Sequence, residues 1–132
     1  MYIYSKKNKK LIACTYKLKK NIKKRTNLSP ENELLQVSII KLDNKFSLRK
    51  HIHTKISRKT IGTQETWIVI NGKIKVSFYD TDKTKICSKT LKKGDISILY
   101  RGGHTFDALE KNTIIYEIKN GPYLKDKDIK RF

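Results

Sequence analysis

A run of alternating residues beside an Asn-Gly pair is the feature that most constrains the fold of this chain. Residues 73–79 alternate between apolar and polar side chains, as expected for a strand with one buried face. Asn71 and Gly72 precede this run, and the apolar residues 67–70 come before them. Because Asn-Gly favours the tight turn that joins two antiparallel strands, we predict a hairpin from Trp67 to Tyr79.

Further short segments have the composition of strands and are separated by turn residues. Residues 17–27 instead form a dense basic run that we expect to be a charged connection, and residues 54–64 lack sustained alternation and are expected to be a loop or a hairpin insertion. No segment predicts a helix with confidence from its apolar spacing. Many short strands at even spacing predict an all-β sandwich or barrel. The expected strands are residues 34–42, 46–53, 86–91, 96–100, 105–109 and 113–118.

The three histidines of the chain lie in or next to these expected strands. His51 and His53 are two residues apart, so in a strand both imidazoles point to the same face. Glu65 begins one apolar run and His104 follows another. Three imidazoles and one carboxylate suit Fe, Mn, Co, Ni or Zn better than Ca or Mg. We therefore expect His51, His53, Glu65 and His104 to hold one divalent transition metal. For Glu65, a salt bridge to a neighbouring Lys or Arg is the alternative.

The spacing of these residues resembles the two motifs of the cupin superfamily. The first motif is matched by His51, His53, Glu65 and, after a six-residue gap, Gly72. The second is matched by Gly94-Asp95, Gly102 and His104. Tyr100 stands where the second motif has a proline, and the segment from His53 to Glu65 is longer than in the motif. The context GGHTFDALE and GPY resembles small cupins associated with surface-polysaccharide or nucleotide-sugar loci.

The resemblance implies a double-stranded β-helix, that is, a jelly-roll barrel, and a homodimer. Residues 34–123 would form the barrel. Residues 1–33 would add N-terminal strands and the basic connection that pack on it, and residues 124–132 would form a charged tail of the same single domain. A barrel of this family would bind or act on a small molecule, here an anionic or sugar-like one.

Four further side chains are candidates for the site. Glu117 lies on the expected strand 113–118, where it faces either the barrel interior, as an acid/base group, or the solvent. Arg58 and Arg101 are candidates to clamp an anionic ligand, and Tyr100 is a candidate ligand contact. For each of these residues an ordinary structural or surface role is the competing interpretation.

The net charge of +19 raises the question of a nucleic-acid partner. The positive charge is mostly lysine spread along the chain, whereas specific base and phosphate recognition favours arginine. A nucleic acid bound through the basic run is therefore the third functional alternative, behind a metal-dependent enzyme and a non-catalytic binding or sensing module. Whether there is turnover stays open.

Cysteine usage and hydropathy bear on where the protein works. Cys14 and Cys87 have no close spacing, which favours two free thiols in a reducing cytoplasm. No apolar run approaches the roughly 20 residues of a membrane span, and residues 1–20 lack the apolar core of a secretory signal. We expect a cytoplasmic protein without a membrane partner.

Overall fold

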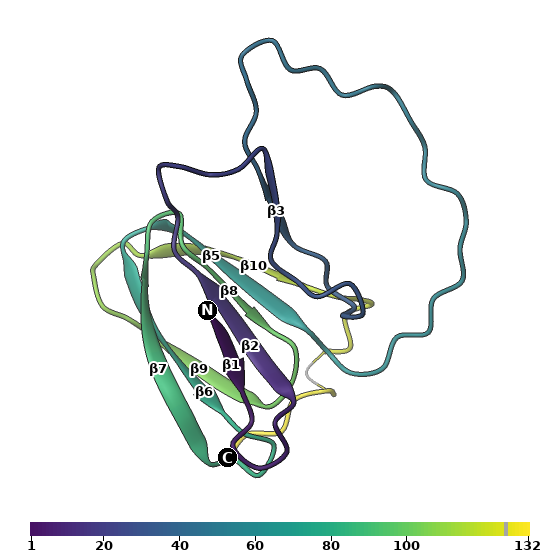
Figure 1. Cartoon of the computed structure of the whole chain (residues 1–132). Coiled ribbons are helices and arrows are strands. Elements are labelled where there is room, and N and C mark those ends of the chain that lie inside the picture. The colour runs from purple at the N-terminus through teal and green to yellow at the C-terminus, as the bar shows by residue number, and fades with distance from the viewer. Residues whose placement is uncertain (126) are drawn as a thin grey trace.

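The computed structural model describes residues 1–125 and 127–132, and these residues form β-strands and no helix. All strand pairs are antiparallel and fall into three sheets, with the order β1-β2-β8-β5-β10, the order β7-β6-β9 and the pair β3-β4 (Figure 1). The prediction of an all-β protein is confirmed. The strands are β1 Tyr2–Tyr4, β2 Leu11–Tyr16, β3 Arg25–Asn27, β4 Ser38–Ile40, β5 Glu65–Asn71, β6 Lys73–Tyr79, β7 Lys85–Lys92, β8 Ile96–Leu99, β9 Gly103–Ala108 and β10 Ile114–Lys119.

Two apolar clusters hold the sheets together. The main core lies between the five-stranded and three-stranded sheets, because alternate residues of β5 and β6 point inward; Trp67, Val69, Ile74, Val76 and Phe78 belong to it. A second cluster covers the opposite face of the five-stranded sheet. There, Leu28 and partly buried apolar residues of 35–39 pack on β8 and its neighbours. Strand β8 is consequently buried on both faces.

The N-terminal residues are part of the main sheet. Strand β2 pairs with β8, which in turn pairs with β5, so β2 lies inside the five-stranded sheet and β1 lies at one edge of it. The segment 1–33 therefore contributes two of the five strands to the main sheet, in addition to packing on it.

The predicted hairpin at Asn71-Gly72 is wrong. Strands β5 and β6 are consecutive, but they belong to different sheets, and the chain crosses between the sheets at Gly72. Gly72 has a φ of +74°, and a Cβ atom there would lie 2.9 Å from the Cα of Thr113. A glycine is needed at position 72 because the connection between β9 and β10 approaches its backbone closely. Strands β5 and β6 diverge after this glycine.

The predicted strand at residues 46–53 is also wrong. Residues 41–62, which we call the arm, contain no strand, and every one of them is exposed. Figure 1 shows the arm as a wide loop between β4 and β5 that projects away from the sheets. The neighbouring strand expected at 34–42 is shortened to β4. The strands expected between residues 86 and 118 are present as β7 to β10.

Within the described residues, no helix has the length and apolar character needed to cross a lipid bilayer.

Candidate functional site

A cleft of about 1090 Å³ opens at one end of the two large sheets. Strands β5 and β10 of the five-stranded sheet form one wall, and the start of β9 from the three-stranded sheet forms the other. The register between β5 and β10 places Lys119 opposite Glu65 and Glu117 opposite Trp67. The cleft is lined by Thr63, Glu65, Tyr79, Asp80, Thr81, Lys83, Leu99, Gly102, Gly103, His104, Thr105, Glu117, Lys119, Asp128, Ile129, Lys130, Arg131 and Phe132.

Glu65 and His104 meet across the cleft. The His104 Nε2 atom lies 3.3 Å from a carboxylate oxygen of Glu65, and the imidazole packs on Trp67 with 4.5 Å between ring centroids. Burial lowers the pKa of His104. The nearby charge of Glu117 raises this pKa in part, and the charge of Lys119 lowers it further. The imidazole is therefore neutral at neutral pH, and its contact with Glu65 is a close polar approach rather than a full ion pair.

Burial also raises the pKa of Glu65, because it disfavours the charged carboxylate. Lys119 opposes this shift with its Nζ atom 3.8 Å from Glu65, whereas Glu117 and Asp128 add to it. A carboxyl group whose pKa is raised above its ordinary value, beside a neutral imidazole, has the chemistry of a proton acceptor and donor. The contact with Lys119 corresponds to the predicted alternative for Glu65, a salt bridge to a neighbouring lysine.

Glu117 faces the cleft, which is the inward one of its two predicted orientations. Its carboxylate accepts a hydrogen bond of 3.1 Å from the indole N–H of Trp67 and lies 3.4 Å from the Lys119 Nζ atom. Trp67 is fully buried, so its N–H depends on this acceptor. Glu117 therefore orients Trp67 and Lys119, and does not itself contact the Glu65–His104 pair.

The C-terminal residues close one side of the cleft. Phe132 packs edge-on against Tyr79, with 5.4 Å between ring centroids, and it approaches Gly103 so closely that a Cβ atom there would lie 2.7 Å from its ring. The Thr63 hydroxyl donates a hydrogen bond to Asp128. The tail predicted at 124–132 thus contacts the candidate site in its last five residues.

His51 and His53 are not part of this cleft. Both lie on the exposed arm, where their rings contact each other at 5.3 Å and the His51 Nδ1 atom lies 3.0 Å from the Arg49 carbonyl oxygen. In the part of the chain that the structure describes, no group of three or more His, Cys, Asp and Glu side chains could hold a metal ion. The structure brings together Glu65 and His104 of the four expected ligands, and two donors alone do not make a metal site.

The other candidate side chains lie outside the cleft. Arg101 pairs with the buried Glu33 at 2.8 Å and donates to the carbonyl of Leu11. Tyr100 is buried, its hydroxyl donates to the carbonyl of Leu28, and burial raises the pKa of Tyr100 to about 12. Arg58 is exposed on the arm. Arg101 and Tyr100 line a smaller pocket of about 470 Å³ together with Glu33, and their contacts there are those of a structural support.

Three residues that shape the cleft or contact His104 were not predicted as site residues from the sequence. Lys119 follows Glu117 by two residues, so alternation places both side chains on one face of β10, and this signal could have found it. Trp67 belongs to the main core, and its contact with His104 depends on how the two sheets stack. The apolar ring of Phe132 in a charged tail indicates that this residue packs on the protein, but its place beside Tyr79 and Gly103 depends on the path of the tail.

Comparison of this chain with models of protein families, with curated proteins and with solved structures finds no match.

The shifted pKa of Glu65 predicts a pH-dependent gain in stability from Glu65→Gln. Because the folded pKa lies above the ordinary value of 4.5, ionisation of Glu65 lowers the stability of the fold as the pH rises above 4.5. A glutamine stays neutral, so we expect its Tm at pH 7 to exceed that of the wild type by about 3 °C and the difference to vanish at about pH 4. Thermal denaturation followed by circular dichroism measures both values.

A matched control for this prediction is Glu110→Gln. It removes the same charge from an exposed carboxylate that pairs with Lys73 at 2.7 Å. We expect a change in Tm of about 1 °C or less at both pH values, because exposed ion pairs contribute little. A Glu65→Gln variant that is less stable than the wild type at pH 7 would contradict the prediction.

Proposed function

We propose that this protein binds a small phosphorylated or otherwise anionic sugar in the cleft between its two large sheets. The observation that carries the proposal is the pairing of Glu65 with His104 inside a cleft that also holds Lys119. Carboxylates accept hydrogen bonds from sugar hydroxyls, and lysine attracts phosphate or carboxylate groups. Tyr79 and Phe132 offer apolar ring faces to the same space. The volume is sufficient for a ligand as large as a nucleotide sugar.

We also propose that the fold is a cupin jelly roll that is open along one side. The adjacency of Glu65 and His104, which come from the two separate motifs, supports this proposal. So does the stacking of a five-stranded sheet on a three-stranded sheet around one core. The residues in the cleft do not fit a metal by themselves, because the other two motif histidines lie on the arm. No step of the proposed function is therefore assigned to a metal.

Proton transfer on the bound sugar is a second candidate function, favoured by the opposite pKa shifts of the pair. The Glu65 carboxylate would accept a proton from a carbon next to a carbonyl group. The neutral His104 imidazole would donate a hydrogen bond to the carbonyl oxygen, where negative charge develops. Return of the proton from Glu65 to the adjacent carbon, with transfer of the hydroxyl proton to the former carbonyl oxygen through His104, would complete an isomerisation that exchanges the positions of the carbonyl and hydroxyl groups.

Binding can be tested with a panel of sugar phosphates, nucleotide sugars and keto acids. Trp67, the one tryptophan of the chain, contacts His104, so its fluorescence reports on the cleft. We expect at least one compound to change the emission saturably and to bind Glu65→Gln and His104→Phe at least tenfold more weakly, because each variant removes a polar partner. The Glu110→Gln control should bind as the wild type does. Equal binding by all variants, or no binding across the panel, would reject the proposal.

A further inference from the structure

The two large sheets are open along β9 and β10. Among the described strands, β9 pairs only with β6 and β10 pairs only with β5, so each presents one edge without a partner. Phe106 points into the molecule toward Trp67, at 5.8 Å between ring centroids, yet it is 38% exposed. On the outer face of β10, Tyr116 is 60% exposed and has apolar neighbours on the same strand. Edges of this kind bind further strands.

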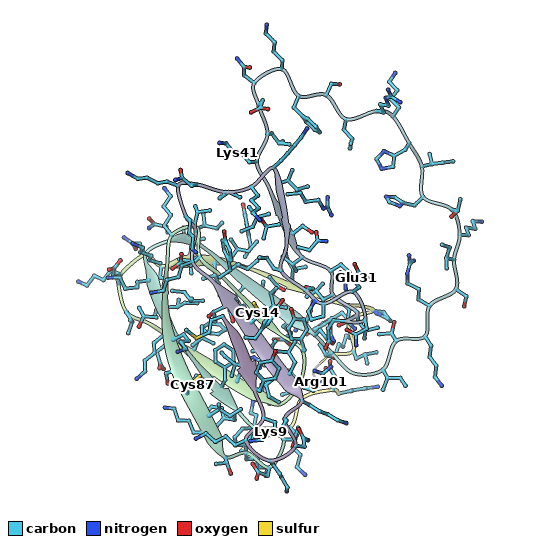
Figure 2. All side chains as sticks on the ribbon, viewed as in Figure 1. Lys9, Cys14, Glu31, Lys41, Cys87 and Arg101 are labelled. Carbon is cyan, nitrogen blue, oxygen red and sulfur yellow. The ribbon has the colours of Figure 1, made fainter. Side chains whose placement is uncertain are left out.

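The arm has the composition of a strand but does not pair with any described strand, whereas β9 and β10 are strands with one unpaired edge each. Between residues 47 and 61 the described residues provide no backbone hydrogen bond to it, and Ile52 is 91% exposed. Phe46, Leu48 and Ile56 are exposed as well. Figure 2 shows the side chains of the arm beyond Lys41 directed into open space. Loops of this length without structure of their own are uncommon within a domain and are usually either functional segments or linkers.

Charge selects the edge that the arm can use. Residues 41–61 carry seven Lys and Arg side chains and one Asp, whereas residues 103–119 carry three carboxylates and two lysines. The cleft beside this edge adds the carboxylates of Glu65 and Asp128, and also the basic side chains of Lys83, Lys130 and Arg131. The opposite edge of the three-stranded sheet is β7, which carries three lysines and no carboxylate and would repel the arm. Strand β1, at the opposite edge of the five-stranded sheet, has three residues and offers little to pair with.

We propose that the arm of one copy of this chain adds to the edge formed by β9 and β10 of a second copy. Residues 46–53 then become a strand, with His51, His53 and Arg49 on the face toward the carboxylates of the cleft. Phe46, Leu48 and Ile52 lie on the other face, between the two copies. The exchange is reciprocal, so each arm covers the edge of the other copy, as two-fold symmetry requires. The idea that His51 and His53 take part in the cleft rests on the proposed function. The assembly of the two copies does not depend on that function.

A second copy fits better than closure by the chain's own arm. The ends of the arm are fixed to the body, by the hydrogen bond from the Lys41 N–H to the Lys24 carbonyl and by the one from the Asn120 side chain to the Gly62 carbonyl. Between these points the arm projects away from the two large sheets (Figure 1). An arm held outward in this way is placed to reach the edge of a neighbouring molecule, and the exposed apolar residues of both surfaces become buried together.

Cross-linking of isotopically mixed protein tests this proposal without any ligand. Equal amounts of 14N-labelled and 15N-labelled protein are unfolded, refolded together and treated with a carbodiimide, which joins lysine amines to carboxylates in direct contact. Mass spectrometry then identifies the linked peptides. We expect peptides that join Lys45, Lys50 or Lys55 to Asp107 or Glu117 and that carry both labels in about half of the cases. Asp82, an exposed carboxylate in the turn before β7, should not link to the arm.

The other outcomes overturn the proposal. Arm-to-edge links that carry one label alone would show closure within one chain, and the absence of such links would show that the arm does not use this edge. A second measurement is the molar mass from light scattering, for which we expect twice the mass of one chain. The double variant Leu48→Ser/Ile52→Ser alters exposed residues and should reduce the mass to that of one chain, whereas Tyr4→Ser on β1 should not. A double variant that stays dimeric would reject the interface, whatever the outcome of the sugar-binding panel.

Discussion

Replacing Trp67 by alanine is expected to destabilise the protein more than any other single truncation in the candidate site. The indole is fully buried between the two large sheets, where it contacts His104 and Phe106. Truncation of a buried tryptophan costs about 3–5 kcal/mol, from lost apolar burial and from the cavity that remains. That cost is a large part of the roughly 5–15 kcal/mol by which domains of this kind are stable. Urea denaturation followed by circular dichroism measures it.

Two further variants show which part of Trp67 matters. Trp67→Phe keeps an aromatic ring in the core but removes the N–H that donates to Glu117. We expect it to cost about 1–2 kcal/mol, because the carboxylate of Glu117 is exposed enough to be hydrated instead. Phe46→Ala truncates an aromatic residue on the exposed arm and is expected to change the stability by about 0.5 kcal/mol or less. A Trp67→Ala variant as stable as Phe46→Ala would show that Trp67 is not in the core.

The strands could be predicted from the sequence where each strand's own residues decide its conformation. Strand composition between turn residues identified the stretches that became β7, β9 and β10. Alternation identified the stretches that became β6 and β8, because a strand with one buried face repeats every two residues. The same pattern at 46–53 failed. Its residues have strand composition, but no described strand of the same chain lies beside them to supply backbone hydrogen bonds. A strand depends on a partner, and the sequence of one segment contains no information about whether that partner is present.

For the candidate site too, some contributions could be predicted from the sequence and others depend on the fold. The motif residues Glu65 and His104 do lie together, although they are far apart in the sequence, and this adjacency was expected from the motif. The contributions of Lys119 and Phe132 were not, since they depend on the register of β10 against β5 and on the path of the tail. His51 and His53 were placed by assuming that their strand would join the barrel. Their absence from the cleft of their own chain therefore follows from the absence of that strand.

Gly72→Ala provides the sharpest test of how the two sheets are connected. With φ at +74°, an alanine costs about 1 kcal/mol in backbone strain, and its Cβ atom would also lie 2.9 Å from the backbone of Thr113. Because backbone atoms cannot give way as a flexible side chain can, we expect a total cost of about 2–4 kcal/mol and a Tm lower by about 10 °C. Thermal and urea denaturation measure these values.

Gly62→Ala is the matched control, because Gly62 also has a positive φ, of +80°, but none of the described atoms lies within 4 Å of the position that a Cβ atom would take there. It should therefore show the backbone strain alone, about 1 kcal/mol. The difference between the two variants measures the contact between Gly72 and Thr113. In a simple hairpin, Asn71-Gly72 would form an exposed turn without this contact, and the two variants would cost the same. Equal costs would thus restore the hairpin that the sequence suggests, and would contradict the crossing from one sheet to the other.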